Sequence, residues 1–198
     1  MNVKPNSTPV RRIMLRPAVF VCTMLLAASA RAQFVYVTNS GTIAITGHNG
    51  PGGNVTIPST IHGLPVTSLG PYAFWGGASP TSVTIPNSVT NIGEGALCCA
   101  SLTNIDVAPQ NPAYAVVGGV LFNLAATTLI QYPEKLKGAS SYSIPDSVTS
   151  IGDYAFYECR GLTGITIPSG VTNIGAHAFG WCDRLANVTI PDERHHSQ

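Results

Sequence analysis

The feature that most constrains this chain is an internal repeat of about 23 residues. Prolines that end short β-type segments recur at Pro145, Pro168 and Pro191, at equal intervals of one repeat. Two further copies begin at Val55 and Val83; the Val83 copy is one residue shorter, and the Val55 copy is lengthened. A unit of this length cannot bury its apolar side alone. The sequence therefore predicts a solenoid of stacked coils.

Each copy contains the parts of one coil. Ile165 and Ile167 flank Thr166, an alternation that predicts a short strand with both isoleucines pointing inward. Pro168 ends that strand because proline cannot donate to a ladder. Gly175 permits the bend after it, and we expect the following Ala-Phe pair to return on a short helical or 3-10 turn. Equivalent positions predict one buried column of Phe74, Leu97, Phe156 and Phe179.

The repeated pattern also resembles a known family. The pattern Ile-Pro-x-x-Val-Thr-x-Ile-Gly-x-x-Ala-Phe-x-x-Cys-x-x-Leu-Thr, at 144–163 and again at 167–185, resembles the BspA-like class of leucine-rich repeats, and the match covers about residues 55–191. The resemblance implies a right-handed parallel β-solenoid. It also implies, for some members, attachment to host proteins or other cells. On this basis we expect a non-enzymatic module for protein binding or adhesion.

Residues 1–32 are typical of a removable export signal. Residues 1–17 are basic with no acidic residue, and the apolar run at 18–30 is too short to span a bilayer, which takes about 20 residues. The Ala30-Arg31-Ala32 motif predicts cleavage between Ala32 and Gln33. We expect Sec export to the periplasm, the cell surface or the medium, while Arg11-Arg12 leaves the twin-arginine route open.

Charge and hydropathy narrow the expected partners. Cleavage would remove five of the ten basic residues and none of the nine acidic ones, leaving a formal charge of −4. Such a chain has no surface for neutralising nucleic-acid phosphates, and no later run predicts a membrane span. We therefore expect an extracellular protein or glycan as the partner.

Two segments depart from the repeat. Residues 33–54 predict a capping hairpin before the repeats at 55–104. Residues 105–141 predict a variant coil with a protruding hairpin, its arms at 119–122 and 128–131, which makes it a candidate functional feature. Regular repeats follow at 142–191, and a polar tail at 192–198. Because the copy that begins at Val188 is incomplete, we expect either end-to-end self-association through strand 188–190 or truncation of a longer array.

The sequence carries no recognisable catalytic or metal-binding motif. It has no Gly-x-Ser-x-Gly elbow, His-Glu-x-x-His helix or phosphate loop, so we expect no catalytic residue, cofactor or metal. Cys159 and Cys182 lie one repeat apart and therefore in adjacent coils. Neighbouring strands are about 4.8 Å apart, a separation that permits either a disulfide or a ladder of packed free thiols.

Two surfaces are candidates for binding. The outward-facing strand positions form a small polar column that could serve as a shallow recognition surface. Three aromatic side chains on the opposite side could instead stack on sugar rings, which would make the chain a glycan-binding accessory module. The polar column comprises Thr56, Thr84, Asp106, Ser143, Thr166 and Thr189, and the aromatic set comprises Trp75, Tyr157 and Trp181.

Overall fold

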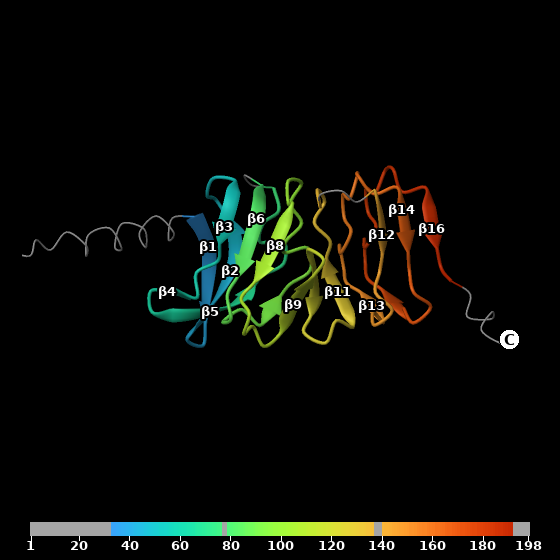
Figure 1. Cartoon of the computed structure of the whole chain (residues 1–198). Coiled ribbons are helices and arrows are strands. Elements are labelled where there is room, and N and C mark those ends of the chain that lie inside the picture. The colour runs from blue at the N-terminus through green and yellow to red at the C-terminus, as the bar shows by residue number, and fades with distance from the viewer. Residues whose placement is uncertain (1–32, 77–78, 137–139, 192–198) are drawn as a thin grey trace, which may run out of the picture.

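The computed structural model describes residues 33–76, 79–136 and 140–191. The predicted export signal and polar tail lie outside these residues. The described part contains sixteen strands and almost no helix, and none of its helices could cross a membrane. Its coils follow one another from β1 at one end to β16 at the other (Figure 1). The predicted β-solenoid is confirmed.

One long side of the solenoid, here called the strand side, consists of two parallel three-stranded sheets. In both sheets Ile or Val side chains point inward, as the alternation with threonine predicts. Figure 1 shows the two sheets one after the other along the molecule. The first contains β3 (Gly53–Thr56), β6 (Pro80–Ile85) and β8 (Asn104–Val107), and the second contains β12 (Ser141–Ser143), β14 (Gly164–Thr166) and β16 (Asn187–Thr189).

The other long side, here called the return side, carries shorter strands. Most pair in parallel with the equivalent segment one coil away, so that Ile151 lies beside Leu129 and Ile174. The parallel strands are β2 (Thr42–His48), β5 (Leu64–Leu69) and β7 (Asn91–Ile92) in the first half, and β11 (Thr128–Gln131), β13 (Ser150–Ile151) and β15 (Asn173–Ile174) in the second.

An antiparallel hairpin covers the first coil. β1 (Phe34–Asn39) pairs with β2 through a turn at Ser40 and Gly41, both with positive φ, as a tight hairpin turn requires. Ile43 and Ile45 of β2 are completely buried, and β2 continues into the solenoid by pairing with β5. A smaller hairpin joins β4 (Thr60–Ile61) to β5 at the extra residues of this coil.

The variant segment differs from the sequence expectation. It forms three antiparallel strands, β9 (Tyr114–Val117), β10 (Val120–Asn123) and β11, of which β9 was not predicted. The expectation that this hairpin protrudes is wrong, because Val120, Leu121 and Phe122 are completely buried. A run of consecutive apolar residues on a strand presents apolar groups on both faces, and here both faces are covered.

β10 separates two hydrophobic cores. Leu121 belongs to the cluster of the first coils, whereas Val120 and Phe122 belong to the cluster of the last coils. The parallel pairing on the strand side of the solenoid is interrupted at this point, since β8 and β12 lie in separate sheets. The predicted aromatic column is divided in the same way. Phe74 and Leu97 lie in the first cluster, while Phe156 stacks on Phe179 and on Tyr132 in the second, with ring centroids 5.1 and 5.2 Å apart.

A buried asparagine attaches the variant segment to the coil before it. Asn111 Nδ2 donates to the carbonyls of Pro86 and Val89 at 2.8 and 3.0 Å. Its Oδ1 accepts from the backbone N–H groups of Ala113 and Tyr114, both at 2.9 Å. The amide thus satisfies four hydrogen-bonding groups at once and fixes the chain that leads into β9.

The segment that carries each Ala-Phe pair and leads back to the strand side is a series of tight turns. In the fourth coil the N–H groups of Ala155 and Tyr157 donate to the carbonyls of Gly152 and Tyr154, three residues earlier. Tyr154 and Glu158 have φ of 58° and 56°, in the left-handed region. A left-handed residue at this spacing prevents a helix from propagating, so the expected short helical or 3-10 return consists of single turns closed by bonds between residues three apart.

Candidate ligand-binding face

Six aromatic side chains gather on the turns that follow the return-side strands and line an open hollow of about 510 Å³. We call this set the aromatic face. The structure brings together all three aromatic residues proposed from the sequence. It adds three that were not proposed as site residues, although their shared repeat position could have revealed them. The aromatic face consists of Tyr72, Trp75, Tyr154, Tyr157, His177 and Trp181.

The backbone turns three of these rings outward. Tyr72, Tyr154 and His177 each precede the alanine of an Ala-Phe pair, and their φ values are 56°, 58° and 53°. The left-handed conformation sends the side chain to the surface, while the Ala155-Phe156 pair that follows Tyr154 is completely buried.

Two breaks in the repeat allow Tyr72 and Tyr154 to meet, although 82 residues separate them. Gly95 occupies the tyrosine position in the second coil, and a Cβ there would lie 2.9 Å from the Tyr72 ring. The variant coil lacks the Ala-Phe turn altogether. The two rings therefore approach edge to face with centroids 5.4 Å apart, and their hydroxyl oxygens are 3.2 Å apart.

The middle of the face is built around Trp75 and Tyr157, which share a repeat position. Their ring centroids are 5.0 Å apart, and Trp75 also meets Tyr72 at 5.7 Å. Gly180 holds the same position in the last coil, where a Cβ would lie 2.8 Å from the Tyr157 ring. The missing side chain gives Tyr157 room to lie along the surface. Trp181 is one position further along and is 61% exposed.

A hydrogen-bonding contact with a neighbouring ring favours the neutral form of the Tyr72 hydroxyl. The Tyr72 hydroxyl donates to Glu94 Oε1 at 3.0 Å. The contact with Tyr154, followed by burial and the nearby carboxylate of Glu94, raises the pKa of Tyr72 well above its ordinary value. The Tyr72 phenol therefore stays uncharged across the physiological range, and it adds a neutral hydroxyl group to the aromatic surface of the hollow.

The polar column on the strand side is interrupted. Thr56, Thr84 and Asp106 lie in register on β3, β6 and β8. Ser143, Thr166 and Thr189 lie in register on β12, β14 and β16, but the two triplets belong to separate sheets. Beside the first triplet, Asn104 Nδ2 donates to Asp106 Oδ2 at 2.6 Å.

The four cysteines of the described residues are free thiols, so Cys159 and Cys182 are not bonded in this structure. Burial, followed by neighbouring charges, raises the pKa of Cys98 and Cys99 to about 12, which keeps both uncharged. Cys182 Sγ instead donates to the Phe156 carbonyl at 3.0 Å. Across the described ranges, no group of three or more His, Cys, Asp or Glu residues is placed to hold a metal ion.

Solved structures of bacterial leucine-rich repeat proteins resemble this chain. A leucine-rich repeat protein from Eubacterium ventriosum ATCC 27560 is 26% identical over 71% of this chain and 42% of its own, with a TM-score of 0.56. The pneumococcal vaccine antigen PcpA is 24% identical over 70% of this chain and 39% of its own, with a TM-score of 0.55. The chain thus spans less than half the length of either structure.

A third structure, the T. pallidum leucine-rich repeat protein TpLRR, is 30% identical over 79% of this chain and 68% of its own, with a TM-score of 0.48. No curated protein matches the chain. Residues 53–140 and 135–197 match the BspA type leucine-rich repeat region in six copies, which cover most of the chain. The chain therefore belongs to the BspA-type leucine-rich repeat family.

Proposed function

We propose that this chain is a non-enzymatic module that binds another protein outside the cytoplasm and contacts it through the aromatic face. Leucine-rich repeat proteins are typically non-enzymatic binding modules, an architecture consistent with protein–protein binding in general. Tyrosine and tryptophan are enriched at the energetic centres of protein interfaces. The hollow lined by six aromatic side chains is the observation that carries the proposal.

The aromatic face supports binding better than the strand side. Its volume of about 510 Å³ lies within the range of roughly 300–1,000 Å³ that is common for binding clefts. Trp75 and Trp181 are 44% and 61% exposed, so a partner would remove substantial apolar area from water. The strand side offers only small polar side chains on two separate sheets.

The extracytoplasmic location rests on the export signal predicted in residues 1–32. Expression of the full chain in a bacterial host, followed by intact-mass analysis of the exported protein, tests it. We expect the mass of a chain whose first residue is Gln33. An uncleaved chain retained in the cytoplasm would contradict the location.

Binding is tested with paired variants of the exported chain against a panel of purified extracellular proteins. We expect at least one partner whose affinity falls about tenfold or more in Trp75→Ala/Trp181→Ala, because loss of a hot-spot residue costs about 2 kcal/mol. The matched control Thr84→Ala/Thr166→Ala alters the strand side and should retain affinity. The reverse pattern would move the interface to the strand side and contradict the proposal.

A glycan ligand is the second candidate, and the exposed tryptophans favour it. The rings of Trp75, Tyr157 and Trp181 border one hollow, and aromatic rings offer an apolar body on which a sugar ring could stack. A glycan array probed with wild type and with the two tryptophan variants separates the candidates. Sugar binding that disappears in Trp75→Ala or Trp181→Ala would support a glycan ligand. If no glycan on the array binds the wild type, the protein ligand remains the proposal.

A further inference from the structure

A second hollow of about 210 Å³ adjoins the aromatic face. Trp75 and Tyr157 line both hollows, so the two hollows share these rings. The carboxyl groups of Glu134 and Glu158 contribute the acidic part of its lining, and the side chain of Cys98 also borders it. Clefts that take a whole small molecule usually exceed about 300 Å³, so this pocket has the size for a single side chain.

Glu134 presents an acceptor without a partner. Its Oε2 atom is shielded from solvent, and no hydrogen-bond partner for it occurs among the described residues. Burial raises the pKa of Glu134; Lys135 partly offsets this effect, and Glu158 adds to it. The backbone N–H of Lys135 donates to the Leu102 carbonyl at 2.9 Å, which ties the segment carrying Glu134 to the second coil. A buried acceptor left unpaired is unfavourable, so a donor that reaches this oxygen is favoured.

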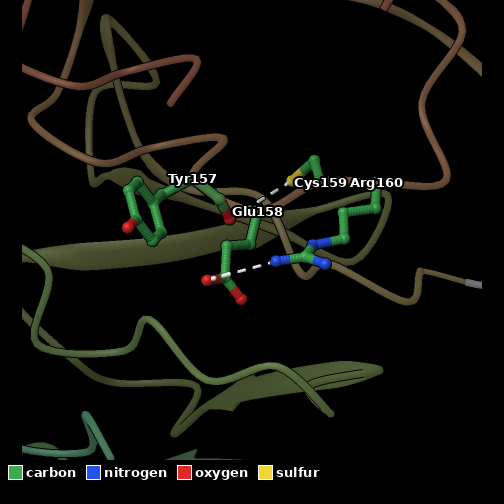
Figure 2. A network of polar contacts seen from close by, with 4 residues as sticks. All are labelled: Tyr157, Glu158, Cys159 and Arg160. Atoms are coloured by element: carbon green, nitrogen blue, oxygen red, sulfur yellow. Dashed lines mark hydrogen bonds and ion pairs between the residues drawn. The ribbon is translucent and has the colours of Figure 1, made fainter. Parts of the chain in front are cut away.

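Glu158 supplies the second carboxylate. Its left-handed backbone, with φ of 56°, turns the loop after Tyr157. Figure 2 shows the Tyr157 ring and the Glu158 carboxylate on the same side of this loop, with the Arg160 guanidinium reaching toward Glu158. Arg160 Nη2 lies 3.7 Å from Glu158 Oε1, and both side chains are partly exposed. An ion pair between partly exposed side chains is weak, so an incoming cation can compete with Arg160.

We propose that this pocket receives the ammonium or guanidinium group of a lysine or arginine side chain from the protein segment that the aromatic face binds. This inference rests on the proposed protein-binding function. The carboxylates of Glu134 and Glu158 would accept the N–H groups, and the ring faces of Trp75 and Tyr157 would add a cation–π contribution. The partner segment therefore carries a basic residue beside apolar residues that cover the aromatic face.

Small cationic probes test this chemistry directly on the exported chain. We would follow tryptophan fluorescence, to which Trp75 in the pocket wall contributes, while titrating N-acetyl-arginine amide and N-acetyl-lysine amide. The matched neutral probes are N-acetyl-citrulline amide and N-acetyl-norleucine amide. We expect a saturable change with the cations and at least tenfold weaker binding of the neutral probes. Equal binding of arginine and citrulline probes, or no saturable response to either cation, would overturn the proposal.

Carboxylate-to-amide variants locate the binding. We expect Glu134→Gln and Glu158→Gln each to lower the affinity for the arginine probe several-fold. Asp106→Asn on the strand side should leave this affinity unchanged. If Glu134→Gln alters thermal unfolding, the Glu158→Gln variant alone decides, because the Glu158 side chain is partly exposed. An affinity for the arginine probe that is unchanged in Glu158→Gln would overturn the pocket assignment. Binding of methyl glycosides, rather than of the cationic probes, at Glu134 would also overturn it. A protein partner lost in Trp75→Ala/Trp181→Ala but indifferent to Glu134→Gln and Glu158→Gln would preserve the proposed function and overturn only this inference.

Discussion

The strand side and the aromatic face are made by the same coils, yet they follow the repeat to different degrees. Within each sheet of the strand side, every coil places a polar residue in register with its neighbour, as Thr166 lies between Ser143 and Thr189. On the aromatic face the equivalent position holds Tyr72, Gly95, no residue in the variant coil, and then Tyr154 and His177. The regular side stacks the coils, and the irregular side produces the hollow.

This difference has a physical origin. A position that stacks on itself in every coil is constrained by the packing above and below it, so similar residues recur. A surface position is free to vary, and removing a side chain there opens space for a neighbouring ring, as Gly95 does for Tyr72. Departures from a local rule tend to mark functional sites. Mutations can test this division between stacking and ligand-shaping positions.

The largest effect is expected in the stacked core. Phe156 is completely buried between the rings of Tyr132 and Phe179, so Phe156→Ala should lower the free energy of unfolding by about 3–5 kcal/mol through cavity formation. Chemical denaturation measures this loss. Trp181→Ala is the matched control, because its ring is mainly exposed and its loss should cost less than about 1 kcal/mol. Equal losses of unfolding free energy in the two variants would contradict the proposed division between stacking and ligand-shaping positions.

A smaller effect is expected where the variant coil is attached. Asn111→Ala removes four hydrogen bonds and should cost about 2–3 kcal/mol, because buried backbone groups are left unpaired. Urea unfolding monitored by circular dichroism checks it. On the strand side, Asn104→Ala removes only contacts with Ser82 and Asp106 and should cost about 0.5–1 kcal/mol. A larger loss for Asn104 would show that the strand side is less tolerant than proposed.

The aromatic face should change shape with little effect on stability in Gly180→Ala. The new Cβ would meet the Tyr157 ring at 2.8 Å and displace it, while the unfolding free energy should change by less than about 1 kcal/mol. Near-UV circular dichroism reports the ring arrangement. Gly161→Ala is the control, because no atom lies within 4 Å of its Cβ position. An unchanged near-UV spectrum in Gly180→Ala would mean that this glycine does not position Tyr157.

The smallest effect concerns pH and the hairpin that covers the first coil. His48 lies between the rings of Phe34 and Phe74, and burial lowers its pKa below the ordinary value near 6.5. The unfolded chain therefore binds this proton more tightly than the folded chain does. The contribution of His48 to stability is complete above pH 6.5 and is lost as the pH falls toward the lowered folded-state pKa.

Urea unfolding of wild type and His48→Phe between pH 8 and pH 5 measures this dependence. Wild type should lose stability relative to the variant only below about pH 6.5. The exposed histidines occur in both proteins and cancel in the comparison. A difference that stays constant with pH would contradict a buried, neutral His48.

The repeat allowed much of the fold to be predicted, but not its division into two cores. The repeat period correctly placed the inward isoleucines and the register of each polar triplet, because both follow from a strand period of two within a fixed coil. It did not reveal β9 or the burial of β10. A run such as Val120-Leu121-Phe122 has no alternation, so periodicity cannot say which of its faces will be covered.

The sequence by itself determined the coil, its apolar interior and the aromatic residues that remain on the surface, since these depend on local spacing and composition. Only the tertiary structure decided that Tyr72 meets Tyr154, and that Trp181 shares a hollow with Trp75 despite its different repeat position. Those contacts depend on how segments that are distant in the sequence pack against one another. The same packing brings Glu134 beside Trp75 and so creates the acidic pocket.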